Sequence, residues 1–222
     1  MTKKKILIVI VVLVVGVVFL LITGALKFSF TVKQTGQASD TVATEASQKT
    51  EAPKKVVQQE KLASKAISFK SPDGLLTFNI NLPIGWATVE NKDADLVAGS
   101  LTSETLASGQ SFTPNINAIS GKHPSYAKTF AEYQTNWKDK TLEGMPSVEF
   151  LRDYSTKVNG VDVYVFEIKN VRADGEALYQ VQYAFYLSDT YALVATGTAP
   201  YENKDKYEDV IKKSIESVKH VD

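Results

Sequence analysis

The chain has 222 residues, with 25 basic side chains, 25 acidic side chains and no cysteine. The missing thiol excludes disulfides, thiolate zinc sites, a cysteine nucleophile and a lipid-modified cysteine. The charges are unevenly distributed, because residues 1–65 hold ten lysines and only four acidic residues. The remainder is therefore acidic, and since nucleic-acid binding requires neutralisation of phosphates, we predict no nucleic-acid partner.

The N-terminal region contains 21 consecutive uncharged residues, Ile6–Leu26. As a helix this segment would be about 32 Å long, enough for a hydrocarbon core of about 30 Å. We predict a transmembrane signal anchor at residues 6–26, with the lipid bilayer as its partner. The flanking lysines are Lys3, Lys4, Lys5 and Lys27. Their bias favours residues 1–5 in the cytoplasm and the C-terminal domain outside.

A cleaved secretory signal is the alternative for the same segment. The small residues Thr23, Gly24 and Ala25 would suit a signal peptidase. The apolar run is longer than the 7–15 residues usual for a signal peptide, which favours the uncleaved anchor. Whether this segment is cut off after export is left open by the sequence.

Residues 27–65 are predicted to be a flexible linker. Thr31–Lys65 lacks aromatic residues and has few hydrophobic ones, a composition typical of disorder. As a coil it would span roughly 30–35 Å. The linker would separate the bilayer from a single domain at residues 66–222, whose length of about 155 residues suits one core.

The domain shows strand-like alternation followed by turn signals. Leu76, Phe78, Ile80 and Leu82 alternate with polar residues, and the turn Ser71–Gly74 predicts that Ile67–Lys70 pairs with them. The dipeptide Asn159-Gly160 favours a two-residue hairpin. The other predicted strands are Leu96–Leu101, Asn115–Ser120, Val148–Val158, Val161–Val171, Leu178–Leu187 and Tyr191–Thr198.

Two amphipathic helices are predicted among these strands, near Tyr126–Thr141 and Lys204–Lys219. Because the strand Val161–Ile168 is apolar on both faces, we expect helices on both sides of the sheet. The predicted class is α+β, with an antiparallel sheet of about six or seven strands and helices packed on its faces.

The segment Phe78-Asn-Ile-Asn-Leu-Pro-Ile-Gly-Trp86 resembles the F-x-I-x-x-P-x-x-W opening of PsbP-like domains, also called the Mog/PsbP fold. The mid-chain helix, the late hairpins and the closing Ser214-Ile-Glu-Ser-Val218 are similar to that family over about residues 66–219. The resemblance implies a non-catalytic scaffold that binds other molecules, as in photosystem II, Ran-binding and bacterial envelope members. It carries no functional residue onto this chain. Physically, Pro83 ends a strand, Gly85 permits a bend and Trp86 is predicted to fill the core.

Several short motifs resemble parts of catalytic or metal sites. Ser125-x-x-Lys128 resembles a β-lactamase motif but lacks its companion elements, and Ser125 is interpreted as a helix N-cap. Asn91–Asp95 resembles the start of a calcium loop, without the glycine and glutamate that such a loop needs, and is interpreted as a solvated turn. His123 and His220 are the only histidines, and His220 is expected in a frayed C-terminus.

Aromatic residues of the strand Leu178–Leu187 were weighed as a binding face. Tyr179, Tyr183 and Phe185 occupy alternate positions together with Val181 and Leu187, and we predict that they are buried.

These readings lead to one functional hypothesis. We predict no catalytic residue, no metal site and no cofactor, and leave the ligand-binding residues unassigned. The chain is expected to be a membrane-tethered, extracytoplasmic binding module with a protein or envelope partner. An envelope hydrolase of unrecognised type and a small-ligand carrier are the alternatives; the first requires a cleft with hydrogen-bonded titratable residues and the second a roomy apolar cavity.

Overall fold

A computed structural model describes residues 61–62, 66–143, 145 and 147–221. The predicted anchor and nearly all of the predicted linker lie outside these residues. Within the described part of the chain, no helix combines the length and apolar character needed to cross a membrane.

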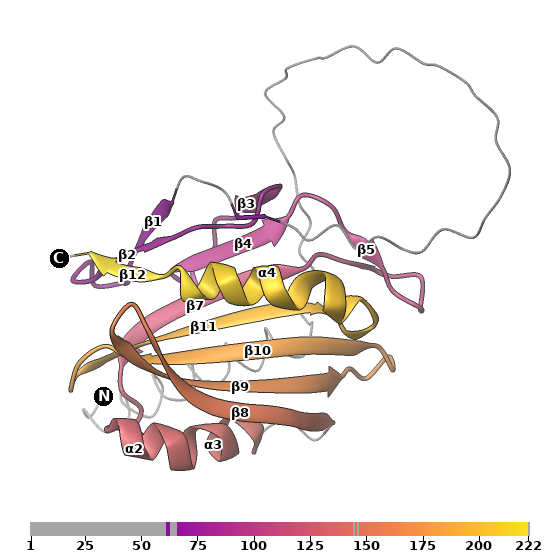
Figure 1. Ribbon diagram of the computed structural model, residues 1–222. Helices are drawn as coiled ribbons and strands as arrows, with labels where there is room; N and C mark the ends of the chain where they lie inside the picture. Colours follow the sequence, from indigo (N-terminus) through magenta and orange to yellow (C-terminus); the bar gives the residue numbers. More distant parts are fainter. Residues whose placement is uncertain (1–60, 63–65, 144, 146, 222) are drawn as a thin grey trace, which may run out of the picture. The chain divides into compact units, whose positions relative to one another are not determined.

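Seven antiparallel strands form the main sheet, in the order β3-β4-β7-β11-β10-β9-β8 (Figure 1). A smaller sheet has the order β1-β2-β12, and β5 pairs with β6. The strand bounds are β1 Ile67–Lys70, β2 Thr77–Ile80, β3 Trp86–Thr88, β4 Leu96–Ser100, β5 Glu104–Thr105, β6 Ser111–Phe112, β7 Asn115–Lys122, β8 Val148–Val158, β9 Val161–Val171, β10 Ala177–Tyr186, β11 Tyr191–Pro200 and β12 Lys219–Val221. The predicted α+β class and the antiparallel sheet are confirmed.

The predicted hairpins follow their turn signals closely. Asn159 and Gly160 have φ angles of 49° and 86°, as a type I′ turn requires, and they join β8 to β9 within the predicted bounds. Gly74 has a φ of 72° in the turn between β1 and β2, which pair from Ile67 opposite Ile80.

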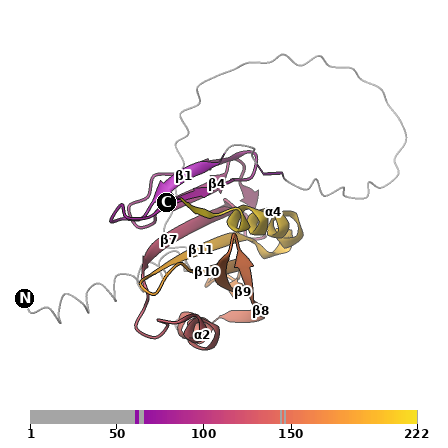
Figure 2. The same ribbon diagram turned by 60° about the vertical axis from the view of Figure 1, so that its left-hand side comes forward.

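Helices cover both faces of the main sheet, as predicted (Figures 1 and 2). On one face lies α4, Lys204–Glu216, preceded by a 3₁₀ turn η2, Tyr201–Asn203. The residues of α4 that join the core on this face of the sheet are Tyr207, Ile211 and Ile215. On the other face lies one continuous helical segment, consisting of α2 Phe130–Glu132, the π-helical η1 Tyr133–Trp137 and α3 Lys138–Leu142.

The core is accordingly divided by the sheet into two apolar layers. The larger layer, under α4, contains the fully buried Tyr179 and Tyr183. Trp86 belongs to this layer and is 8% exposed, which confirms its predicted role in the core. The smaller layer, under α2 and α3, contains Tyr133 and Phe166.

The first helix begins later than predicted. Thr129 is its N-cap, accepting a hydrogen bond from the backbone N–H of Glu132, while the Glu132 side chain accepts from the backbone N–H of Thr129. This capping box satisfies two N–H groups at once. Ser125 lies four residues earlier in an exposed turn, so its interpretation as the N-cap was wrong.

Candidate binding groove

An open groove of about 350 Å³ lies between the two sheets, near the hairpin that joins β8 to β9. Its floor is apolar and its rim carries polar groups. The lining residues are Phe78, Asn159, Val161, Phe185, Leu187, Val218, Lys219 and His220. They come from β2, β9, β10, β12 and the turns beside them, so that the groove exists only in the folded chain.

Asn159 positions one wall of this groove. Its side-chain Nδ2 donates to the carbonyl oxygen of Val218 at 2.7 Å and to that of Glu216 at 3.3 Å. These carbonyls belong to the end of α4 and the residues after it, where helix acceptors otherwise lack partners. The hairpin is thus tied to the segment that leads into β12.

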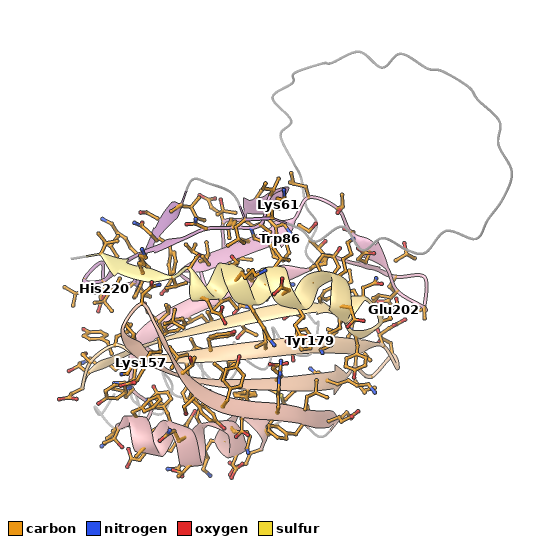
Figure 3. All side chains as sticks on the ribbon, in the orientation of Figure 1. Lys61, Trp86, Lys157, Tyr179, Glu202 and His220 are labelled. Carbon is orange, nitrogen blue, oxygen red and sulfur yellow. The ribbon has the colours of Figure 1, made fainter. Side chains whose placement is uncertain are left out.

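His220 lies in an ordered strand, so the expected frayed C-terminus was wrong. β12 pairs with β2, with Lys219 opposite Asn79 and His220 opposite Phe78. The rings of His220 and Phe78 are 5.6 Å apart, and Figure 3 shows His220 at one end of the domain. Three residues of pairing and this ring contact hold the last strand in place.

The most buried charged side chain belongs to a clamp rather than to the groove. Glu167, 1% exposed, faces α4 from β9. Its carboxylate accepts hydrogen bonds from Arg152 Nε at 2.7 Å and from Tyr179 Oη at 3.0 Å, and it forms a salt bridge with Lys212 at 2.7 Å. Burial, together with the nearby Glu167 charge, raises the pKa of Tyr179. The arrangement fastens α4 to the sheet.

A second cluster fastens the other end of α4. Glu104 of β5 accepts hydrogen bonds from Lys206 Nζ at 2.6 Å and from the hydroxyl of Tyr207. Burial raises the pKa of Tyr207 to about 12, and the bond to Glu104 adds to this shift. These ionisable groups satisfy one another and connect the β5–β6 hairpin to the helix.

His123 takes part in an aromatic cluster, and both of its ring nitrogens have partners. Nε2 lies 2.6 Å from the carbonyl oxygen of Ser188, and Nδ1 lies 2.9 Å from the hydroxyl of Tyr133. Because a carbonyl only accepts, Nε2 carries the proton and the hydroxyl of Tyr133 donates to Nδ1 in the neutral ring. The ring also stacks on Tyr186, with 4.8 Å between centroids. His123 therefore supports packing between β10 and the π-helical segment.

The calcium-loop-like turn and the Ser125-x-x-Lys128 motif show no arrangement of a functional site among the described residues. In the Asn91–Asp95 turn, the Asp95 carboxylate accepts from the backbone N–H of Ser120 at 2.7 Å. Burial raises the pKa of Asp95, and the bonds from Ser120 act against that rise. Within the described residues, no group of three or more acidic or histidine side chains is arranged to hold a metal ion. Ser125 and Lys128 are both exposed.

The aromatic strand behaves as predicted. Tyr179, Tyr183 and Phe185 of β10 are at most 1% exposed. The opposite face is not solvated, however: Gln182 is 9% exposed and accepts a hydrogen bond from Trp137 Nε1 at 2.6 Å. The π-helical segment thus covers this face of β10 at Gln182.

The sequence reasoning left the groove unassigned and missed its residues. Asn159 was recognised only as a turn residue, and Lys219 was placed at the end of a helix. No local signal marked the groove, because Val161 directly after the turn already pairs with the apolar Val158 in its own hairpin. The predicted anchor flanks Lys3, Lys4, Lys5 and Lys27 lie outside the described residues.

Comparison with known proteins identifies the fold. No protein-family model matches the chain, and no curated protein matches it in sequence. Among solved structures, LpqN of Mycobacterium tuberculosis, described as involved in cell envelope biogenesis, is similar with a TM-score of 0.56 and 13% identity, covering 71% of this chain and 91% of LpqN.

Two further structures show weaker likeness. Cyanobacterial PsbP from Synechocystis sp. PCC 6803 has a TM-score of 0.49 and 14% identity over 72% of this chain and 94% of its own. The Ran-binding protein Mog1p of Saccharomyces cerevisiae has a TM-score of 0.46 and 14% identity over 71% of this chain and 96% of its own.

The described domain is an α+β domain in which helices lie on both faces of an antiparallel sheet. In particular, its fold is PsbP-like, as the resemblance in the sequence implied. At these identities the likeness defines the fold, and the function has to be argued from this chain's own residues.

Proposed function

We propose that the chain is a membrane-tethered, extracytoplasmic module that binds a protein or another envelope component without catalysing a reaction. The observation that carries this proposal is the open, apolar-floored groove between the two sheets. Its lining offers the partly exposed Val161 and Leu187 as contact surface, with the buried Phe78 and Phe185 beneath them, and apolar surface removed from water is the main driving force of association.

The ionisable groups support binding over hydrolysis. Glu167 and Glu104 are occupied by partners that hold α4 on the domain, and neither residue lines the groove. An acid–base pair in a hydrolase needs a free site about 3 Å from both groups where a reacting atom can sit. The groove offers His220 and Lys219 at its rim over an apolar floor, which suits recognition.

The placement outside the cytoplasm rests on the uncharged run Ile6–Leu26 and on the lysines before it. The involvement of LpqN in cell envelope biogenesis agrees with such a placement. The bilayer would be a permanent partner through the anchor, and the linker would let the domain reach a second one.

Two measurements on intact cells test the proposal. Added protease should cleave the linker and release the domain, while the chain keeps its full length before treatment. Crosslinking followed by recovery through a tag after Asp222 should capture a partner that a tagged 1–65 fragment does not. A domain protected from protease, or equal capture by the fragment, would refute the proposal.

A further inference from the structure

We infer that the groove binds an extended, acidic peptide segment of a partner protein, which adds to the outer edge of β12 and places an apolar side chain on the groove floor. This inference rests on the proposed function and specifies the chemistry of the partner. The surface concerned consists of the groove residues and of β12.

The first argument is the free edge of β12. This strand pairs with β2 on one side, and its other side pairs with no strand in the part of the chain that the structure describes. The groove lies along β12, since Val218, Lys219 and His220 all line it. An edge strand beside an apolar groove is the arrangement by which proteins bind extended peptides, with backbone bonds for affinity and a groove for alternate side chains.

The second argument is the shape of the groove. Sites for small molecules bury 70–90% of the ligand, usually in about 300–1,000 Å³. This groove, of about 350 Å³, is at the lower end of that range and open to solvent, so that a free amphiphile would keep part of its apolar surface in water. A protein partner supplies its own cover over the buried side chain, as the rim of an interface does.

The third argument is charge. Lys219 is exposed, and no ion pair joins it to another residue of the described chain. The neighbouring charges are already engaged: Lys157 pairs with Asp162 at 2.5 Å, and the Glu216 carboxylate accepts from the hydroxyl of Tyr183. Lys219 is thus a cation beside the groove without an ion pair among the described residues, and an acidic residue of the peptide would complement it. The predicted linker of this chain, residues 27–65, is rich in lysine, and its positive charge would be repelled by Lys219, so it does not fit the site as the bound segment.

The test uses the full-length chain in phosphatidylcholine nanodiscs. A phage library of random dodecapeptides is panned against it, and selected peptides are synthesised with a fluorophore for anisotropy titration. Selected sequences should alternate apolar and polar residues and carry an aspartate or glutamate. The substitution Lys219→Glu should weaken their binding by about tenfold. Lys70→Glu makes the same charge change on β1, at the opposite edge of the small sheet, and should leave affinity within about twofold.

A second pair of variants probes the groove floor. Leu187→Ser removes apolar surface from the groove and should weaken binding by about tenfold, whereas Leu101→Ser changes a distant, exposed leucine and should not. Urea midpoints verify that each variant is folded. The inference would be overturned if the selected peptides lacked acidic residues, or if Lys219→Glu and Lys70→Glu weakened binding equally. It would also be overturned if no peptide were selected while the fatty acid laurate, added as a small-ligand probe, bound to the domain. None of these results depends on the cellular topology, so failure here is distinguishable from failure of the proposed function.

Discussion

Arg152 Nε donates to Glu167 Oε1 at 2.7 Å, joining a side chain that is 55% exposed to one that is 1% exposed. The Nη2 atom of the same guanidinium donates to Oε1 of Glu208 in α4 at 3.0 Å. Lys212 contacts both carboxylates as well. Two carboxylates and two cations thus alternate between β8, β9 and α4, and the buried Glu167 is their centre.

Replacing the central carboxylate should destabilise the domain. In Glu167→Gln, Lys212 and Arg152 both lose a counter-charge. The loss costs more at Lys212, which is mostly buried, than at Arg152, whose exposed side chain water can solvate. We expect the free energy of unfolding, from urea titration, to fall by about 2–3 kcal/mol. The control Glu143→Gln breaks the exposed pair with Lys140 and should cost under about 0.5 kcal/mol. If the two substitutions lowered the free energy of unfolding equally, burial would not explain the contribution of Glu167.

Gly197 of β11 is expected to tolerate no side chain, because α4 lies directly on it. An added Cβ would be 2.1 Å from Ile211 Cγ2. Gly197→Ala should therefore lower the free energy of unfolding by about 1–3 kcal/mol. Ile211→Ala alone should cost about 2–5 kcal/mol, and the double variant should cost at least about 1 kcal/mol less than the sum. Gly121→Ala is the control, since nothing lies within 4 Å of its added Cβ. Strict additivity would show that the helix lies elsewhere.

Acid sensitivity should depend on Asp153. The hydroxyl of Tyr164 donates to its carboxylate at 2.5 Å, and this bond, followed by the one from Lys138, holds the pKa of Asp153 below its ordinary 3.8. A carboxyl with a lowered folded pKa contributes stability that is complete above the unfolded pKa and lost as pH falls through the folded one. Tyr164→Phe moves that pKa back toward 3.8.

The free energy of unfolding should therefore decline less steeply in Tyr164→Phe than in the wild type between about pH 5 and about pH 2.5. In an Asp153→Asn background, Tyr164→Phe should no longer change the slope. Parallel declines in wild type and Tyr164→Phe would show that the hydrogen bond does not stabilise the ionised carboxylate.

Local signals accounted for most of the predicted elements. The hairpin at Asn159-Gly160 was predictable because only residues that tolerate positive φ suit a type I′ turn. The helix start was missed because the interpretation rested on Ser125, which follows a proline, and overlooked Thr129, which has Glu132 three residues later. The reciprocal bonds of Thr129 and Glu132 decide the matter, and the T-x-x-E spacing was available in the sequence.

The groove and the ionic clamp were beyond sequence reasoning for a different reason. β12 is three residues long, and its partner β2 is about 140 residues away in the chain, so no local pattern indicates it. Glu167 lies within the mostly apolar stretch Val163–Ile168 of β9, where the sequence gives no sign of its partners Arg152 and Lys212. The groove needs β12, and the clamp is completed only when Lys212 and Glu208 of α4 reach the sheet, so both features depend on non-local contacts.

Two substitutions at Asn159 should separate the cost of backbone strain in the turn from the loss of the side-chain hydrogen bonds at the groove. Asn159→Gly keeps the φ of 49° accessible but removes the bonds to Val218 and Glu216, so the free energy of unfolding should fall by about 1 kcal/mol. Asn159→Ala adds the cost of a left-handed alanine, and should lose about 2 kcal/mol in total. In both variants the amides of β12 should exchange with deuterium faster than in the wild type, and those of β10 should change less, because the tether to the end of α4 is gone while the main sheet is intact. Unchanged exchange in β12 with the expected stability loss would place the effect in the turn alone and would remove Asn159 from the wall of the groove.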